Sequence, residues 1–254
     1  MERKMDLNNE MLFLEQKAGT YKNTNSTISE WSVDSYIKVY SRHIENGKNK
    51  RGLELGCSNG YSTQKLADII GGGLDVVDGS QCMLQKASKR VKNRNVNFKY
   101  GLFENIKEIE IYDYIFCSYV LEHVIDPDEI LKICYRALKK GGKLCITVPN
   151  AKALSRQMAV NMGLLESVYQ LTDNDIAHGH RRVFDLKLLT ETIGKSRFEL
   201  LTVGGTFVKQ FADFQLNKMI QEGIIGEQQL KGMQKLAEIY PEISGSIYAI
   251  LLKK

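Results

Sequence analysis

The chain has 254 residues, 43% of them hydrophobic, which is enough to bury one sizeable core, so we expect one domain rather than two. Its 35 basic and 30 acidic residues give a net charge of +5 and are mixed along the sequence. This balance permits an anionic small molecule but does not call for nucleic acid. No apolar run reaches the roughly 20 residues of a membrane helix, and the first residues lack the apolar core of a signal peptide. We therefore expect a cytoplasmic monomer or homodimer that does not enter the membrane.

The first 50 residues are expected to form a helical cap. Apolar residues within 1–19 indicate a short amphipathic helix. A second helix is predicted from Trp31 to Tyr40, where apolar residues recur at helical spacing, with Ser32 or Asp34 near its N-cap.

Residues 51–150 alternate between short apolar runs and helical patterns, which predicts a parallel sheet covered on both faces. The expected strands are Arg51–Leu55, Leu74–Val77, Val96–Tyr100, Tyr114–Cys117 and Lys143–Val148. The expected helices are Tyr61–Ile70, Gln81–Val91 and Asp128–Lys139. The fold class is therefore α/β and doubly wound, and ligands of such folds bind at the carboxyl ends of the strands.

The rest of the chain interrupts this alternation and then resumes it. Residues 151–184 indicate an insertion, helical at 154–160, that can roof a pocket at the carboxyl edge. Residues 185–254 are predicted to complete the sheet, with helices at 185–194 and 211–237 and strands at 198–203, 206–209 and 246–252. We expect a single domain with a cap at 1–50, a core at 51–150, a lid at 151–184 and a C-terminal part at 185–254.

The five cysteines form no C-x-x-C pair and fall on or beside predicted strands and helices. We expect them to be reduced packing residues without a metal or a disulfide.

A ligand loop is predicted where the first strand meets the first core helix. Gly56 and Gly60 permit backbone torsions and a close approach that a Cβ would prevent, and the free N–H groups of the helix start can face a ligand. Glu54 places a carboxylate beside this turn, which suits an ammonium or sulfonium charge better than a pyrophosphate. Asp78 ends the second strand, where an acid usually binds ribose hydroxyls.

These residues carry a resemblance. The segments Glu54-Leu-Gly-Cys-Ser-Asn-Gly60, Asp78, Ser118-Tyr-Val-Leu-Glu-His-Val124 and Leu138-Lys-Lys-Gly-Gly-Lys-Leu144 resemble the motifs of class I S-adenosylmethionine-dependent methyltransferases. The similarity covers about residues 51–150 and is closest to the small-molecule enzymes that include ubiquinone-pathway and sugar methyltransferases. Two differences are Ser58, in place of the middle glycine of the family loop, and Leu102-Phe103, where the family presents an acid to the adenine.

The resemblance implies a Rossmann-like mixed sheet whose last strand inserts antiparallel beside the fifth. It also implies S-adenosylmethionine as cofactor and S-adenosylhomocysteine as product. The implied cofactor-binding residues are Glu54, Gly56, Cys57, Ser58, Gly60, Asp78, Gly79, Ser80, Met83, Phe103, Glu104 and Ser118.

Methylation of an alcohol requires a base near neutral pKa, and histidine fits this need. His123 follows the fourth strand, and His178 and His180 are rival bases that we expect on one face of an extended segment. A metal pair is conceivable there, but without clustered ligands we expect no metal. The candidate substrate-binding residues are Tyr21, Trp31, Tyr119, Arg181 and Arg182, and the two arginines could clamp an oxyanion, so that Arg181→Ala would raise the acceptor KM.

The function expected is methylation of a small polar acceptor, foremost an oxygen of a sugar, a nucleotide-sugar or a phosphorylated metabolite in bacterial surface-glycan or secondary metabolism. N-methylation of an amino sugar, an NAD-dependent oxidoreductase and an inactive cofactor-binding partner protein remain open. The loop reads Gly-x-Ser-x-Gly rather than the G-x-G-x-x-G of nicotinamide enzymes. Nucleic-acid methylation is not expected, because the chain has neither an Asn/Asp-Pro-Pro-Tyr segment nor a Pro-Cys nucleophile.

Overall fold

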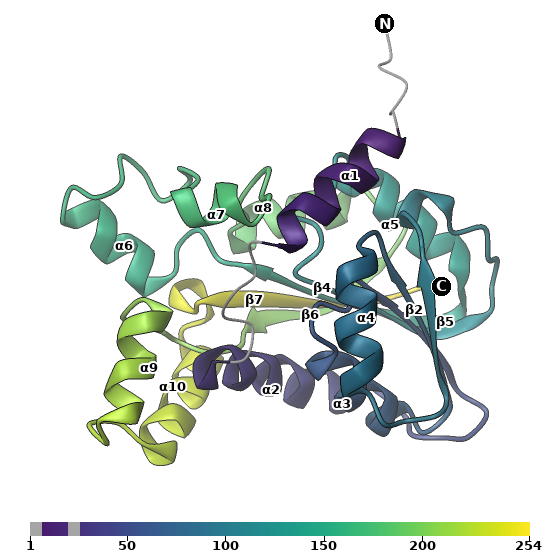
Figure 1. Ribbon diagram of the computed structural model, residues 1–254, viewed down its shortest axis with the longest axis horizontal. Coiled ribbons are helices and arrows are strands. Elements are labelled where there is room, and N and C mark those ends of the chain that lie inside the picture. Colours follow the sequence, from purple (N-terminus) through teal and green to yellow (C-terminus); the bar gives the residue numbers. More distant parts are fainter. Residues whose placement is uncertain (1–6, 20–25) are drawn as a thin grey trace, which may run out of the picture.

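A computed structural model describes residues 7–19 and 26–254 of the chain. Its centre is a seven-stranded sheet in the order β3-β2-β1-β4-β5-β7-β6 (Figure 1). The strands are β1 (Arg51–Leu55), β2 (Gly73–Asp78), β3 (Val96–Tyr100), β4 (Tyr112–Ser118), β5 (Leu138–Pro149), β6 (Glu199–Gly205) and β7 (Ser246–Leu252). The first five pair in parallel, and β7 runs antiparallel to both β5 and β6. The expected α/β class, the mixed sheet and the antiparallel last strand are confirmed.

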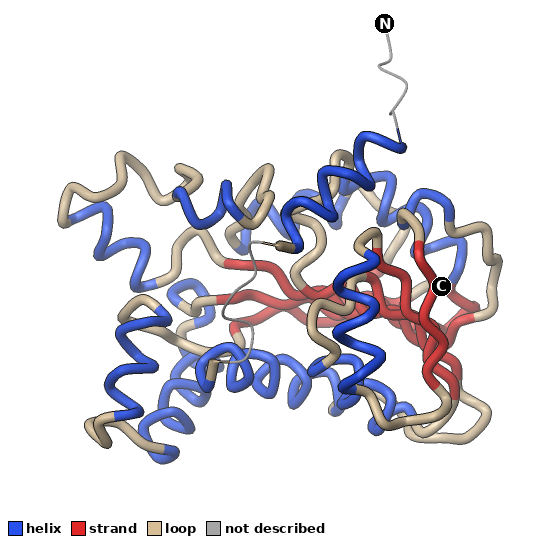
Figure 2. The backbone as a smooth tube through the Cα atoms, in the orientation of Figure 1, coloured by secondary structure: helices blue, strands red, loops and turns tan. Residues whose placement is uncertain are grey.

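Helices cover both faces of the sheet (Figure 2). One face packs against α5 (Pro127–Ala137) and α8 (Leu186–Gly194) in the largest hydrophobic cluster. The other packs against α2 (Thr27–Ser41), α3 (Tyr61–Ile70) and α4 (Gln81–Arg90). The remaining helices are α1 (Leu7–Ala18), α6 (Leu154–Asn161), α7 (Asp173–Ala177), α9 (Asp213–Gln221) and α10 (Glu227–Ile239), with short 3-10 turns at Phe103–Asn105 and Pro241–Ile243.

Side-chain caps mark several helix starts. Asp126 accepts hydrogen bonds from the N–H groups of Asp128 and Glu129 at the start of α5, where Pro127 occupies the first turn. The predicted N-cap of α2 is wrong. Ser26 caps that helix, Ser32 donates to the Ile28 carbonyl within it, and Asp34 instead accepts from the Tyr61 hydroxyl.

Several other boundaries differ from the prediction. Helix α5 ends at Ala137 rather than Lys139, because Leu138 pairs with Tyr112 and begins β5 before the predicted start at Lys143. The predicted helix at 211–237 is divided into α9 and α10. Residues 206–209 are not a strand. Phe207 instead leaves the sheet and packs with Ile28 in a third cluster that joins α2 to α9 and α10.

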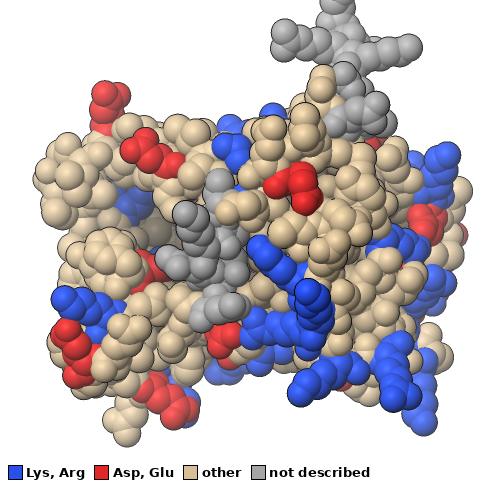
Figure 3. Space-filling view, viewed as in Figure 1, with Lys and Arg blue, Asp and Glu red and all other residues tan. Residues whose placement is uncertain are grey.

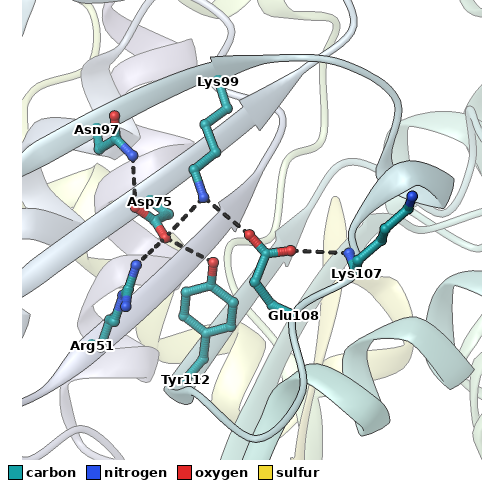
Figure 4. Close-up of polar contacts among 7 residues, drawn as sticks. All are labelled: Arg51, Asp75, Asn97, Lys99, Lys107, Glu108 and Tyr112. Carbon is teal, nitrogen blue, oxygen red and sulfur yellow. Dashed lines mark hydrogen bonds and ion pairs between the residues drawn. The ribbon is translucent and has the colours of Figure 1, made fainter.

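A polar network around the buried Asp75 links the four strands on one side of the sheet. Asp75 of β2 accepts hydrogen bonds from Arg51, Asn97, Lys99 and the Tyr112 hydroxyl, which come from β1, β3 and β4 (Figure 4). Although burial opposes ionisation, these donors lower the pKa of Asp75. The network therefore has a structural explanation and needs no ligand.

All five cysteines are free thiols. Cys57, Cys117, Cys134 and Cys145 are buried and Cys82 is partly buried, which agrees with the expected packing role. Within residues 7–19 and 26–254, no helix is both long and apolar enough to cross a membrane. Figure 3 shows acidic and basic side chains spread over one face, with Lys and Arg gathered toward the side of the sheet that carries β2 and β3.

Candidate active site

The loop between β1 and α3 has the backbone that the glycine pattern predicted. Gly56 and Gly60 adopt left-handed conformations, with φ of 75° and 81°. A Cβ on Gly60 would lie 2.7 Å from the Cα of Ala87, so no larger residue fits against α4. Ser58 also has a positive φ, of 47°. The loop therefore keeps a left-handed residue at the position where the family has its middle glycine, at the cost of some strain.

Asp78, at the tip of β2, ties this loop to the next helix. Its carboxylate accepts hydrogen bonds from the Cys57 N–H at 2.8 Å, the Ser80 N–H at 2.8 Å and the Cys57 thiol at 3.4 Å. Burial raises the pKa of Asp78, although these hydrogen bonds act to lower it. Cys57 thus has a specific partner and does more than fill space.

Glu54 is buried beneath the same loop. Its Oε1 accepts a 2.7 Å hydrogen bond from Ser62, whereas Oε2 has no hydrogen-bond partner among the described residues. Burial raises the pKa of Glu54 to about 7. An orphaned buried carboxylate oxygen fits a ligand that brings an ammonium or another donor.

Helix α1 closes over the start of α4, which the sequence did not reveal. Glu15 of α1 accepts from the Ser80 hydroxyl at 2.7 Å and from the Cys82 N–H at 3.2 Å. Two further residues of α1 contact the insertion. Lys17 donates to the Ile176 carbonyl, and Glu10 accepts from Arg181. The cap therefore bridges the cofactor loop and the insertion.

A cavity of about 470 Å³ opens at the carboxyl ends of the strands. Its lining includes most of the predicted cofactor residues, namely Gly56, Ser58, Asp78, Gly79, Ser80, Met83, Phe103, Glu104 and Ser118. Leu102 and Leu14 add apolar surface to the same cavity. The apolar wall that replaces the family's adenine-binding acid is thus present, and burial raises the pKa of the neighbouring Glu104.

The same cavity is lined by a cluster of Glu122, His123 and His180. The His123 and His180 rings meet edge to face with centroids 4.7 Å apart, and His123 Nε2 lies 3.9 Å from Glu122 Oε1. Glu122 is fully buried, and neither of its oxygens has a hydrogen-bond partner in the described part of the chain. Burial raises the pKa of Glu122 to about 7, while burial and the nearby His180 lower the pKa of His123 to about 3.

Asp175, in the insertion, lies beside His180. Its Oδ1 is 3.3 Å from His180 Nδ1 without the alignment of a hydrogen bond, and its Oδ2 accepts from Arg156 and the Thr172 N–H. Although burial acts to raise it, the nearby His180 and the hydrogen bonds from Thr172 hold the pKa of Asp175 well below its usual range. Neither Asp175 nor Glu122 was among the predicted site residues, because nothing in the local sequence brings them to His180.

The expectation that His178 and His180 share one face of an extended segment is wrong. His178 is the C-cap of α7, and Gly179 turns the chain with a φ of 84°. The two rings are tilted by 51° with centroids 6.5 Å apart, and both line the cavity. Burial, with His180 nearby, lowers the pKa of His178.

The expectation that no other ligand clusters with these histidines is also wrong. One ligand atom each of Glu122, His123 and His180 lies within 4.8 Å of the others, a spacing that could accommodate a cation. Among the described residues, no other group of three acids, histidines or cysteines has ligand atoms this close together.

The structure gives the two predicted arginines other partners. Arg182 donates to the backbone carbonyls of Leu121, Val124 and Ile125. Arg181 donates to the His123 carbonyl and to Glu10 and stacks on Phe13, 4.9 Å from the ring centroid. Neither side chain lines the cavity, so the placement does not support an oxyanion clamp and indicates that both hold the loop after β4.

Of the predicted aromatic residues, Tyr119 lines the cavity and Trp31 does not. Tyr119 lines the cavity, has a positive φ of 56° and hydrogen-bonds Ser246 at 2.8 Å. Trp31 packs on the third hydrophobic cluster instead, and Tyr36 of the same helix lines the cavity. Tyr21 lies outside the described residues.

The strand order, the left-handed loop, the acid at the tip of β2 and the orphaned Glu54 oxygen together define a class I S-adenosylmethionine-dependent methyltransferase. A sequence profile described as "Methyltransferase domain" matches residues 46–221, which is more than half of the chain. The chain belongs to this methyltransferase domain family.

Relatives and solved structures agree with this family. The mitochondrial ubiquinone biosynthesis O-methyltransferase of Homo sapiens is 33% identical over 140 residues, which are 50% of this chain and 37% of that protein. The chain thus spans little more than a third of this relative's length. A possible histamine N-methyltransferase from Thermotoga maritima has a TM-score of 0.65 at 21% identity, over 96% of this chain and 100% of that one. The N-methyltransferase NodS from Bradyrhizobium japonicum, bound to S-adenosylhomocysteine, has a TM-score of 0.61 at 13% identity, over 96% and 98%. At these identities the two structures show the shared fold.

Proposed function

We propose that this protein transfers the methyl group of S-adenosylmethionine to a hydroxyl oxygen of a small polar acceptor, in the class of sugars, nucleotide-sugars or phosphorylated metabolites. The observation that carries the proposal is one cavity lined both by the cofactor loop with Asp78 and by Glu122, His123 and His180. Donor and acceptor can therefore meet in a single space. The O-methyltransferase name of the curated relative supports oxygen as the acceptor atom.

The cofactor, when bound, supplies a methyl group already activated on a sulfonium. The chain contributes positioning of the acceptor and removal of its proton. Asp78 would hold the ribose hydroxyls, while Met83, Leu102 and Phe103 would pack against the adenine. Glu54 is not among the lining residues and would act on the ammonium group through its charge from beneath the loop.

His180 is the base that this arrangement favours. Its Nδ1 lies 3.3 Å from the Asp175 carboxylate, whose charge favours the proton of the neutral ring on that nitrogen, so we assign the lone pair to Nε2. As the oxygen–carbon bond forms and the carbon–sulfur electron pair passes to sulfur, the hydroxyl proton moves to Nε2. Asp175 then stabilises the imidazolium. His123, whose pKa is lowered to about 3, stays neutral and positions the acceptor.

Whether the acceptor carries a negative charge depends on the cations that line the cavity. Lys209 lines the cavity but is 2.6 Å from Asp213, which also lines it, so this cation is already partly balanced. We therefore expect a neutral polar group to react, with any phosphate of the acceptor nearer to Lys209.

The test is production of S-adenosylhomocysteine with a panel of sugars, nucleotide-sugars and phosphorylated alcohols, for the wild type and for His180→Gln. We expect turnover with at least one acceptor and a fall in kcat of about 100-fold or more in the variant. The matched control is His43→Gln, because His43 lies outside the cavity lining. Equal kcat for His180→Gln and the wild type would remove His180 as the base.

A further inference from the structure

The proposed chemistry leaves the environment of Glu122 unexplained. This side chain is fully buried and lines the cavity, yet neither carboxylate oxygen has a hydrogen-bond partner within the described residues. A buried carboxylate without donors is strongly unfavourable, and native proteins rarely keep one without a function. The missing donors are therefore expected on a ligand.

The neighbours of Glu122 are acceptors too. His180 Nδ1 lies 3.3 Å from Asp175 Oδ1 without the alignment of a hydrogen bond, and the carboxylate charge favours the proton of the neutral ring on Nδ1, which leaves Nε2 as an acceptor. Burial lowers the pKa of His123 to about 3, so its neutral ring also keeps one acceptor nitrogen. The cluster thus offers two carboxylate oxygens and two ring nitrogens, and a complementary ligand must bring several donors.

We infer that the acceptor is a vicinal diol, in which one hydroxyl group donates to Glu122 and the adjacent hydroxyl group donates to His180 Nε2. This inference rests on the proposed methyl transfer and narrows its substrate class. The first hydroxyl stays bound to Glu122 as an anchor. The second gives its proton to His180 as its oxygen is methylated.

A diol fits this cluster better than an amine. An amine attacks in its neutral form, whereas a buried carboxylate would hold it as the unreactive ammonium. A diol avoids this problem, because one hydroxyl group binds Glu122 while the oxygen of the other is methylated. A divalent cation on Glu122, His123 and His180 would also supply positive charge, and the experiment must separate this case.

The experiment measures S-adenosylhomocysteine production by the full chain, with EDTA present, on matched probes. These are methyl α-mannopyranoside with its cis-diol, its 2-deoxy counterpart, catechol and ethanolamine. We expect turnover with mannoside or catechol, at least tenfold lower kcat/KM for the deoxy sugar, and none with ethanolamine. Mannoside and catechol distinguish a sugar diol from an aromatic one.

Variants complete the test. Glu122→Gln keeps the shape but replaces one acceptor oxygen by an NH₂ donor, so the diol KM should rise tenfold or more while the Kd of S-adenosylmethionine stays unchanged. Glu129→Gln on the exposed start of α5 is the control and should leave both constants unchanged.

Equal turnover of the deoxy sugar, turnover of ethanolamine alone, or no turnover of any probe by protein that binds S-adenosylmethionine would overturn the diol inference. Activity that EDTA abolishes and Mg²⁺ or Zn²⁺ restores would overturn it in favour of a cation. Loss of S-adenosylmethionine binding itself would instead refute the proposed function, so the two failures are distinguishable.

Discussion

Asp78 and Cys57 join the two halves of the cofactor site, through a 2.8 Å hydrogen bond from the Cys57 N–H to Asp78 Oδ2. The Ser80 N–H occupies the other carboxylate oxygen at the same distance. The acid at the tip of β2 is thereby fixed before any ligand arrives. Oδ2 also accepts from the Cys57 thiol, whereas Oδ1 accepts only from Ser80 within the described residues and can take a further hydrogen bond from a ribose hydroxyl.

The titration of Glu122 predicts a pH-dependent activity. Burial raises the pKa of Glu122 to about 7, and donors on the acceptor bind the ionised form best. The kcat/KM for the acceptor should therefore rise as the pH passes through about 7. The measurement is a pH–rate profile of the wild type and Glu122→Gln. A variant profile with the same rise near pH 7 would assign this ionisation to another group.

The same shift predicts a stability effect. Glu122 has an unperturbed pKa of 4.5 in the unfolded chain and about 7 when folded, so the folded protein binds this proton more tightly. The wild type should lose stability relative to Glu122→Gln between about pH 4.5 and 7, by roughly 3 kcal/mol in all, and the difference should stay constant above pH 7.

Chemical denaturation without ligand at pH 5 and pH 8.5 measures this difference. Glu129→Gln, whose carboxylate is exposed beside Lys132, is the control and should follow the wild type. A constant free-energy difference between wild type and Glu122→Gln at the two pH values would show that the carboxylate is not buried without partners.

The close approach of Gly60 to α4 predicts a specific packing defect. In Gly60→Ala, the new Cβ would meet the Ala87 backbone at 2.7 Å, in addition to the strain of a positive φ. We expect a loss of at least about 2 kcal/mol of unfolding free energy and weaker cofactor binding. Gly163→Ala is the matched control, because Gly163 has a φ of 73° but open space around it. The two variants should differ in unfolding midpoint; equal losses would mean that strain alone matters at Gly60.

The Arg181–Glu10 ion pair predicts a role in holding the cap. Arg181 binds Glu10 of α1 at 2.8 Å and also the His123 carbonyl. Arg181→Ala should increase amide hydrogen exchange in α1 and in the loop after β4. Glu10→Gln should affect α1 alone, because Nε of Arg181 can still donate to the His123 carbonyl in that variant. Unchanged exchange in α1 for both variants would show that the pair does not hold the cap.

Much of the sheet could be predicted because its signals are local. Strands β1, β3 and β7 and helix α3 have the predicted bounds, since apolar periodicity and turn residues define them. The end of α5 could not be predicted in this way, because Leu138 is extended only through its pairing with Tyr112 on β4.

The site was predicted in its cofactor half and only partly in its acceptor half. The glycine loop follows β1 and Asp78 ends β2, so each is marked by a local strand-to-turn signal in the sequence. Glu122 meets His180 only because the insertion folds back, with the Arg181 N–H donating to the Glu122 carbonyl. Glu15 reaches Ser80 from a helix whose own pattern gives no sign of that contact. Long-range contacts of this kind leave no local periodicity.

The most direct test of the account is isothermal titration of the wild type and Asp78→Asn with S-adenosylmethionine and with NAD. The control is Asp113→Asn, because Asp113 lies at the start of β4, where it accepts from the Arg51 N–H and Lys139, and does not line the cavity. The account predicts that S-adenosylmethionine binds one site, that Asp78→Asn raises its Kd by about tenfold or more, and that NAD gives no heat. Binding of NAD, or S-adenosylmethionine binding that is indifferent to Asp78, would contradict it.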